Sequence, residues 1–119
     1  MRGWLNRLIK EEQRILGTIN IIFTSDAYLL EMNQQYLNHD YYTDVITFDY
    51  SEKDVVSGDV FMSIDTIEYN AKVMKKRKIE EVWRVSAHGV LHLCGYKDKK
   101  LEDKALMRSK EDYYLSLRT

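Results

Sequence analysis

Two histidines four residues apart, His88 and His92, are the side chains of this sequence best suited to chemistry. On a helix, residues at this spacing lie one turn apart on the same face, so both imidazoles can reach one metal ion. Gly95 follows three residues after His92, where a helix commonly ends in a left-handed conformation. The chain can then fold back and bring Asp98 to the same ion. Two neutral nitrogens and one carboxylate leave a coordination position for water, which is typical of a hydrolytic metal site.

The residue after the first histidine separates this motif from that of the zinc proteases. Those enzymes place a glutamate directly after the first histidine as general base. Here that position is Gly89, so a conventional protease mechanism is disfavoured. The sequence indicates no other general base, and the only catalytic group that it suggests is a metal-bound water.

The bulk composition is that of an ordinary globular protein. The chain has 119 residues, 45% of them hydrophobic and 31% charged, which predicts one domain over residues 1–119 with a continuous core. Its single cysteine excludes an intramolecular disulfide framework and indicates a reducing compartment, the cytoplasm, with no disulfide-linked partner. No apolar run approaches the roughly 20 residues that span a bilayer, so we expect no membrane association.

The charge of the chain gives no general support for nucleic-acid binding, because the net charge is −1. An RNA partner would need a local basic patch. One basic run, residues 72–78, is typical of a solvated helix end. A second run flanks the metal motif and contains Lys97, Lys99, Lys100 and Lys104.

Hydrophobic periodicity predicts an α/β (α+β) fold, a small mixed β-sheet packed with about five helices. We expect strands at 18–24, 44–50 and 59–64, the last two paired as a hairpin around a turn at Ser57-Gly58. Asp65 is expected to cap the third helix. The predicted helices cover residues 4–15, 25–37, 65–76, 79–94 and 101–117.

The helix at 79–94 carries the metal motif and is apolar around most of its circumference, which predicts a central, buried position. Glu81, Arg84, His88 and His92 share one side of it. Buried imidazoles are costly unless each nitrogen has a ligand or a hydrogen-bond partner. Metal coordination by one nitrogen and a hydrogen bond from the other would satisfy both requirements.

The motif and its surroundings resemble the YbeY-type endoribonucleases of ribosomal RNA maturation, whose pattern is close to H-G-x-L-H-L-x-G-Y-D-H. Residues 88–96 follow that pattern here as HGVLHLCGY. Upstream, residues 43–48 (TDVITF) are similar to the family's T-D-V-L-S-F, and residues 58–60 (GDV) to its G-D-I. Further matches, in the family's order, are Asn33, Tyr36, Met107 and Glu111.

Two positions depart from the family pattern. The third metal ligand of the family is usually a histidine, but the aligned residue here is Asp98, preceded by Lys97 where the family has an aspartate. Leu37 aligns with an arginine that the family uses beside its active site, and Lys97, Lys99 or Arg84 could replace that cation. Family members also usually carry one more strand ahead of the first helix.

The resemblance implies a metal-dependent, single-strand-specific endoribonuclease of the cytoplasm, acting in rRNA maturation and ribosome biogenesis. It implies one Zn2+ per chain held by His88, His92 and Asp98, although an aspartate ligand also suits another divalent metal. The ion would activate a water and polarise a phosphoryl oxygen. RNA and ribosomal particles are the implied partners, and the residues expected to contact RNA are Arg84, Lys97, Lys99 and Lys100.

Two alternative functions stay open on the sequence. The departures at Leu37 and Asp98 also suit a ribosome- or RNA-associated metal-binding protein whose catalytic activity is weak or lost. The other alternative is a metallohydrolase that acts on another substrate, including a peptide.

Overall fold

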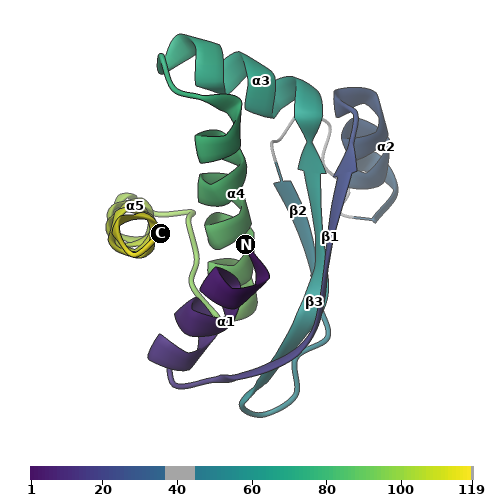
Figure 1. The fold of residues 1–119 in the computed structure, drawn as a ribbon. Coiled ribbons are helices and arrows are strands. Elements are labelled where there is room, and N and C mark those ends of the chain that lie inside the picture. Colours follow the sequence, from purple (N-terminus) through teal and green to yellow (C-terminus); the bar gives the residue numbers. More distant parts are fainter. Residues whose placement is uncertain (37–44, 119) are drawn as a thin grey trace.

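The protein is described by a computed structural model that covers residues 1–36 and 45–118. Its three strands form a mixed sheet in the order β1-β3-β2, in which β1 is parallel and β2 antiparallel to β3 (Figure 1). None of the helices in the described ranges is long and apolar enough to cross a membrane. The predicted mixed sheet with five helices is confirmed; the elements are α1 (Arg2–Glu11), β1 (Ile15–Thr24), α2 (Asp26–Tyr36), β2 (Val45–Asp49), β3 (Val55–Ser63), α3 (Ile64–Val73), α4 (Lys78–Leu93) and α5 (Leu101–Ser116).

Helix α4 lies between the sheet and α5 (Figure 1). Val85 and Leu91 of α4 are buried in one core with Val60 and Met62 of β3. The helix approaches the sheet closely because Gly89 has no side chain; a Cβ there would lie 2.6 Å from a methyl carbon of Val60. The central, buried position predicted for the histidine helix is confirmed.

The two faces of the sheet are covered by different helices. Leu8 of α1 is fully buried in the core that α4 forms on one face. On the other face, Leu29 and Met32 of α2 pack with Ile46 of β2. Successive side chains of a strand point to opposite faces, so Phe61 of β3 packs toward α2 while its neighbours face α4. The sheet therefore holds α4 on the side away from α2.

The hairpin of β2 and β3 is confirmed, but the predicted turn at Ser57-Gly58 is wrong. Both residues lie inside β3, and residues 50–54 make the connection. A Cβ at position 58 would lie 2.4 Å from the carbonyl oxygen of Phe48 on β2 and 2.7 Å from a methyl carbon of Leu93 at the end of α4. This glycine therefore marks a close approach between strand and helix, which the sequence cannot distinguish from a turn.

Helix α3 begins directly where β3 ends, so its N-cap is Ser63 and the predicted cap at Asp65 is wrong. The Ser63 hydroxyl accepts a hydrogen bond from the amide of Thr66 at 3.1 Å. Asp65 lies in the first turn, where its carboxylate accepts from the amide of Asp26 at 3.0 Å. It thereby joins the start of α3 to the start of α2.

The first helix ends earlier than predicted, at Glu11 instead of residue 15. Gln13 has a φ of 61°, a left-handed conformation that stops the helix and turns the chain into β1. The strand in turn begins before residue 18, with an irregularity in its pairing between Leu16 and Ile19. The short α1–β1 turn, residues 12–14, lies against the end of α4 through two side-chain hydrogen bonds.

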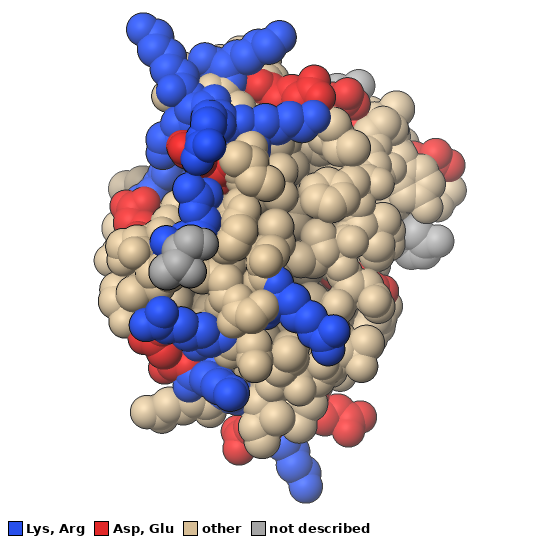
Figure 2. Space-filling view, in the orientation of Figure 1, with Lys and Arg blue, Asp and Glu red and all other residues tan. Residues whose placement is uncertain are grey.

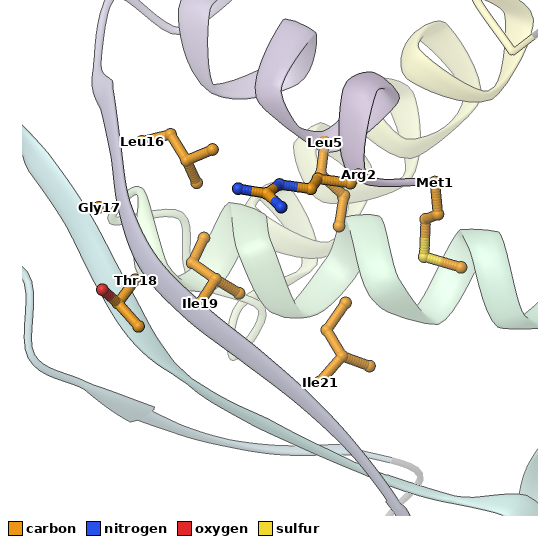
Figure 3. A pocket seen from close by; sticks show the side chains of 8 residues that line it. All are labelled: Met1, Arg2, Leu5, Leu16, Gly17, Thr18, Ile19 and Ile21. Atoms are coloured by element: carbon orange, nitrogen blue, oxygen red, sulfur yellow. The ribbon is translucent and has the colours of Figure 1, made fainter.

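A hollow of about 450 Å³ lies between α1 and β1. Figure 3 shows the guanidinium of Arg2 reaching from α1 toward the strand across this space. The hollow shares no residue with the metal motif, and most of its lining is apolar; the lining residues are Met1, Arg2, Leu5, Leu16, Gly17, Thr18, Ile19 and Ile21.

Candidate metal centre

Helix α4 and the loop after it bring three candidate metal ligands together. The Nε2 atoms of His88 and His92 lie 3.0 Å apart, and Oδ2 of Asp98 lies 3.2 Å from the first and 3.4 Å from the second. The loop can return toward the helix because Gly95 has a φ of +106°, which glycine adopts without a Cβ clash. The predicted grouping of the two histidines with the aspartate is confirmed.

Each imidazole is oriented by a hydrogen bond from its other ring nitrogen. His92 Nδ1 lies 2.9 Å from the carbonyl oxygen of Tyr96, which can only accept, so Nδ1 carries a proton. His88 Nδ1 donates to Oε2 of Glu111 at 2.6 Å. With Nδ1 protonated, a neutral imidazole has its lone pair on Nε2, and the two Nε2 atoms face each other.

The donor set fits a metal ion. Two nitrogen lone pairs and a carboxylate oxygen that lie within 3.4 Å of one another repel unless a cation lies between them. A tetrahedral Zn2+ with bonds of about 2.0–2.1 Å places its ligand atoms about 3.3 Å apart. The side chains of His88, His92 and Asp98 are 17%, 23% and 40% exposed, so the cluster is open on its solvent side. A further ligand can therefore reach it.

Cys94, two residues after the second histidine, is unsuited as a fourth ligand. Its side chain is buried in the core, and burial, together with the charge of Glu12, raises the pKa of the thiol to about 11. Its sulfur is also not among the ligand atoms that the structure groups with the two histidines. Within the described ranges, the two histidines and Asp98 are the only group of three metal-binding side chains.

A chain of buried charges continues behind His88. Glu111 of α5 also accepts from Nη1 of Arg84 at 3.1 Å, and Arg84 in turn donates to the buried Glu81. Burial opposes ionisation of Glu111, but the hydrogen bond from His88, followed by the charge and hydrogen bond of Arg84, holds the pKa of its carboxyl below the ordinary value. Burial likewise opposes the charge of Arg84, yet its two glutamates raise its pKa. The group that orients His88 is therefore a carboxylate.

Sequence reasoning did not find the part that Glu111 plays at the site. The residue was noted only as a family match, and its contact with His88 joins two helices across 23 positions. No short sequence spacing pairs Glu111 with His88. The match of Glu111 to the family pattern was the one feature of the sequence that pointed to a role at the site. The structure also places the guanidinium of Arg84 between two carboxylates with 13% of its side chain exposed, and its contact with RNA stays a prediction.

The other three predicted RNA contacts, Lys97, Lys99 and Lys100, are exposed in the loop that carries Asp98. Lys97 and Lys99 directly flank Asp98 in the chain, and the contact of the three lysines with RNA stays a prediction. Leu37, which aligns with the family's arginine, lies outside the described residues, as do positions 43 and 44 of the TDVITF match.

The first basic run, residues 72–78, lies at the opposite end of α4 from Asp98. Figure 2 shows Lys and Arg side chains gathered at that end of the molecule, over α3 and the turn into α4. Arg77 and Lys78 form ion pairs with nearby glutamates. This arrangement agrees with a solvated helix end.

Comparison with known proteins decides the family. A family model described as Endoribonuclease YbeY matches residues 1–118 of the chain. The chain belongs to the YbeY family. A YbeY relative from Cytophaga hutchinsonii is 52% identical over 119 residues, which cover 99% of this chain and 83% of the relative. One from Flavobacterium psychrophilum is 54% identical over 115 residues, 97% of this chain and 82% of the relative.

A solved structure agrees with the family assignment. The solution structure of a protein from Thermotoga maritima aligns with a TM-score of 0.68 and 30% sequence identity, over 97% of this chain and 76% of that one. The resemblance drawn from the motif is thus confirmed. The carboxylate of Asp98 reaches both Nε2 atoms, so the cluster has three donors.

Proposed function

We propose that this chain is a metal-dependent, single-strand-specific endoribonuclease of rRNA maturation, and that residues 1–119 form one hydrolase domain. Membership in the endoribonuclease YbeY family supports the reaction class. The single observation that carries the proposal is the cluster of His88, His92 and Asp98, in which hydrogen bonds orient both imidazoles. Because its solvent side is open, this donor set is typical of a hydrolytic metal site, here one that cleaves a phosphodiester bond, and not of a closed structural metal site.

His88, His92 and Asp98 are the residues that hold the metal, and Zn2+ is the ion that suits them best, although the aspartate oxygen also suits another divalent ion. When bound, the ion lowers the pKa of a coordinated water toward neutrality and draws charge from a phosphoryl oxygen. The chain's own groups prepare this chemistry. Glu111 and the Tyr96 carbonyl keep each imidazole in the tautomer whose Nε2 can bind a metal.

The lysines of the Asp98 loop bring the RNA backbone to this centre. Lys97, Lys99 and Lys100 are exposed, so their ammonium groups can neutralise phosphates without first being released from a buried pair. Arg84 adds a positive charge one helical turn before His88, although its two carboxylate partners limit its reach. Phosphate contacts of this kind make binding salt-dependent, so substituting Lys97 and Lys99 by glutamine should lower the salt slope by about 0.7 per contact.

We place the protein in the cytoplasm and in association with ribosomal particles. A single cysteine that is free and buried supports a reducing compartment, since it forms no structural disulfide. Ribosomal particles carry the single-stranded rRNA that the proposed reaction requires.

A second candidate is an RNA-associated metal-binding protein with weak or lost activity. One observation favours it, namely the aspartate at position 98 where the YbeY family usually has a histidine. An anionic ligand donates more charge to the metal than an imidazole does, and it thereby weakens the acidity of a coordinated water.

Metal content and RNA cleavage, measured on wild type and on His92→Ala, separate these candidates. We expect freshly purified wild type to contain about one metal ion per chain and to cleave single-stranded rRNA, and His92→Ala to lose both properties. Asp112→Asn removes an exposed carboxylate of α5 outside the cluster and should keep both. Wild type that binds no metal would refute the metal centre. Bound metal with equal cleavage by both proteins would favour the second candidate.

A further inference from the structure

The α1–β1 turn holds the end of the histidine helix at two points. Arg14 Nη2 donates to the carbonyl oxygen of Cys94 at 3.1 Å, which satisfies a carbonyl that has no partner within the helix. Glu12 accepts a hydrogen bond from the hydroxyl of Tyr96 at 2.6 Å. The first contact joins two residues that lie 80 positions apart in the sequence, and the second joins two that lie 84 positions apart. The segment between α4 and Asp98 is therefore fastened to the N-terminal part of the chain.

Glu12 is a meeting point of three donors. Its carboxylate accepts hydrogen bonds from the hydroxyl of Tyr114 and, at 3.1 Å, from the ammonium of Lys110, in addition to the one from Tyr96. Its side chain is only 10% exposed, and although this burial opposes ionisation, the three donors hold the pKa of its carboxyl below the ordinary value. The ammonium of Lys110 also lies 5.5 Å from the centre of the Tyr96 ring. The Tyr96 side chain is thus held by a charged, largely buried network.

Tyr96 transmits this anchoring to the metal centre through its backbone. Its N–H donates to the carbonyl oxygen of Leu91 at 3.0 Å, and its own carbonyl accepts from His92 Nδ1 at 2.9 Å. With its hydroxyl on Glu12, Tyr96 is fixed at three points. Asp98 follows two residues later. The position of Tyr96 therefore sets both the acceptor that orients His92 and the start of the loop that presents Asp98.

We propose that Glu12 is a positioning residue for the metal centre, acting through the hydroxyl of Tyr96. It restricts the loop before any metal binds, so that the second imidazole and the aspartate already face a common point. Without this anchor, metal binding would have to order the loop as well, and affinity would fall. The proposal rests on the metal centre of the proposed function.

A neighbouring carboxylate provides a matched control. Glu11 also accepts from a tyrosine of α5, the hydroxyl of Tyr113 at 2.6 Å, and it pairs with Arg7 at 3.3 Å. Its hydrogen bond therefore resembles that of Glu12 to Tyr114, but its contacts lead to α5 and α1 and not to the loop. A general weakening of the α1–α5 contact would appear in variants of both residues.

The test compares Glu12→Gln and Tyr96→Phe with Glu11→Gln by competition of each protein with a chelator for Zn2+. A group that orients a metal ligand directly changes affinity by about 10- to 100-fold, so one step further out we expect a loss of about 3- to 10-fold for Glu12→Gln and Tyr96→Phe. The double variant should lose no more than the larger single loss, because both changes act through the same contact between Tyr96 and residue 12. Glu11→Gln should stay within about twofold of wild type.

Amide hydrogen exchange on the metal-free proteins supplies a readout that needs no metal. The Tyr96 amide should be protected in wild type and in Glu11→Gln, and should exchange faster in Glu12→Gln and Tyr96→Phe. If wild type binds no Zn2+, the metal centre fails, and this exchange pattern still decides whether Glu12 orders the loop. Unchanged exchange and unchanged affinity in Tyr96→Phe would overturn the proposal, as would an equal loss in Glu11→Gln. Tyr96→Phe keeps the other donors on Glu12, so it decides the matter should Glu12→Gln not fold.

Discussion

The sharpest test of the site geometry is the substitution Glu111→Gln, which keeps the shape of the side chain and removes its charge. The two carboxylate oxygens have different partners: Oε1 accepts from Arg84 at 3.1 Å and Oε2 from His88 Nδ1 at 2.6 Å. A glutamine offers one oxygen and one NH2 group, so only one of these donors can keep an acceptor. Either arrangement places a donor against a donor inside the protein.

The two arrangements disturb different partners of Glu111. If the amide NH2 faces His88, the ring must place its proton on Nε2, which then cannot bind a metal. If the NH2 faces Arg84, that buried guanidinium loses a carboxylate partner, and its side chain is only 13% exposed. Changes to a group that orients a metal-bound histidine cost about 10- to 100-fold in metal affinity, which is about 1.4–2.8 kcal/mol. We expect a loss in that range.

The assay measures Zn2+ affinity by competition with a chelator, and folding stability separately in excess chelator. In chelator, the loss of a buried hydrogen-bond partner should lower the free energy of unfolding by about 1–3 kcal/mol. Asp112→Asn, the adjacent exposed carboxylate of α5, makes the same chemical change outside the network and should alter neither quantity. A folded Glu111→Gln protein with wild-type affinity would refute the reasoning, because His88 would then be oriented without the carboxylate.

Three further outcomes follow from the same structure. Asp98→Ala should lower metal affinity at least about tenfold, and unchanged affinity would show that the aspartate is not a ligand. The pKa of Glu12 lies below its ordinary 4.5 in the folded state, so its ionised form stabilises the metal-free protein above pH 4.5. That contribution is lost as the pH falls. The free energy of unfolding should therefore fall less steeply with decreasing pH in Glu12→Gln than in wild type. Gly89→Ala would place a Cβ 2.6 Å from a methyl carbon of Val60 and should lower the free energy of unfolding by about 1–3 kcal/mol. The control Gly3→Ala adds a Cβ with no atom within 4 Å and should not destabilise the protein. Thermal unfolding of both variants checks this.

The sequence predicted those parts of the site that depend on short spacings. His88 and His92 meet because a helix repeats every 3.6 residues, and Gly95 ends that helix because it can adopt a positive φ. Asp98 follows within three residues of the turn, so its return to the histidines is a local event. The mixed sheet was also predictable, since alternating apolar residues mark its strands.

The errors arose where one residue type serves two purposes. Gly58 was expected in a turn, but it lies in a strand whose backbone approaches Leu93 of α4. Ser63, which ends β3, caps the next helix, and so the predicted cap at Asp65 is two residues late. Glycine, serine and aspartate occur at turns, caps and close contacts alike, and only the neighbouring elements decide among these roles.

What the sequence by itself determined is the set of candidate metal ligands, because all three lie within eleven residues and their geometry follows from one helix and one short loop. Only the tertiary structure decided what surrounds them. Glu111 reaches His88 from α5, and Glu12 reaches Tyr96 from the α1–β1 turn, across 23 and 84 positions. Such pairings arise from the packing of helices on a common core, and no periodicity along the chain encodes them.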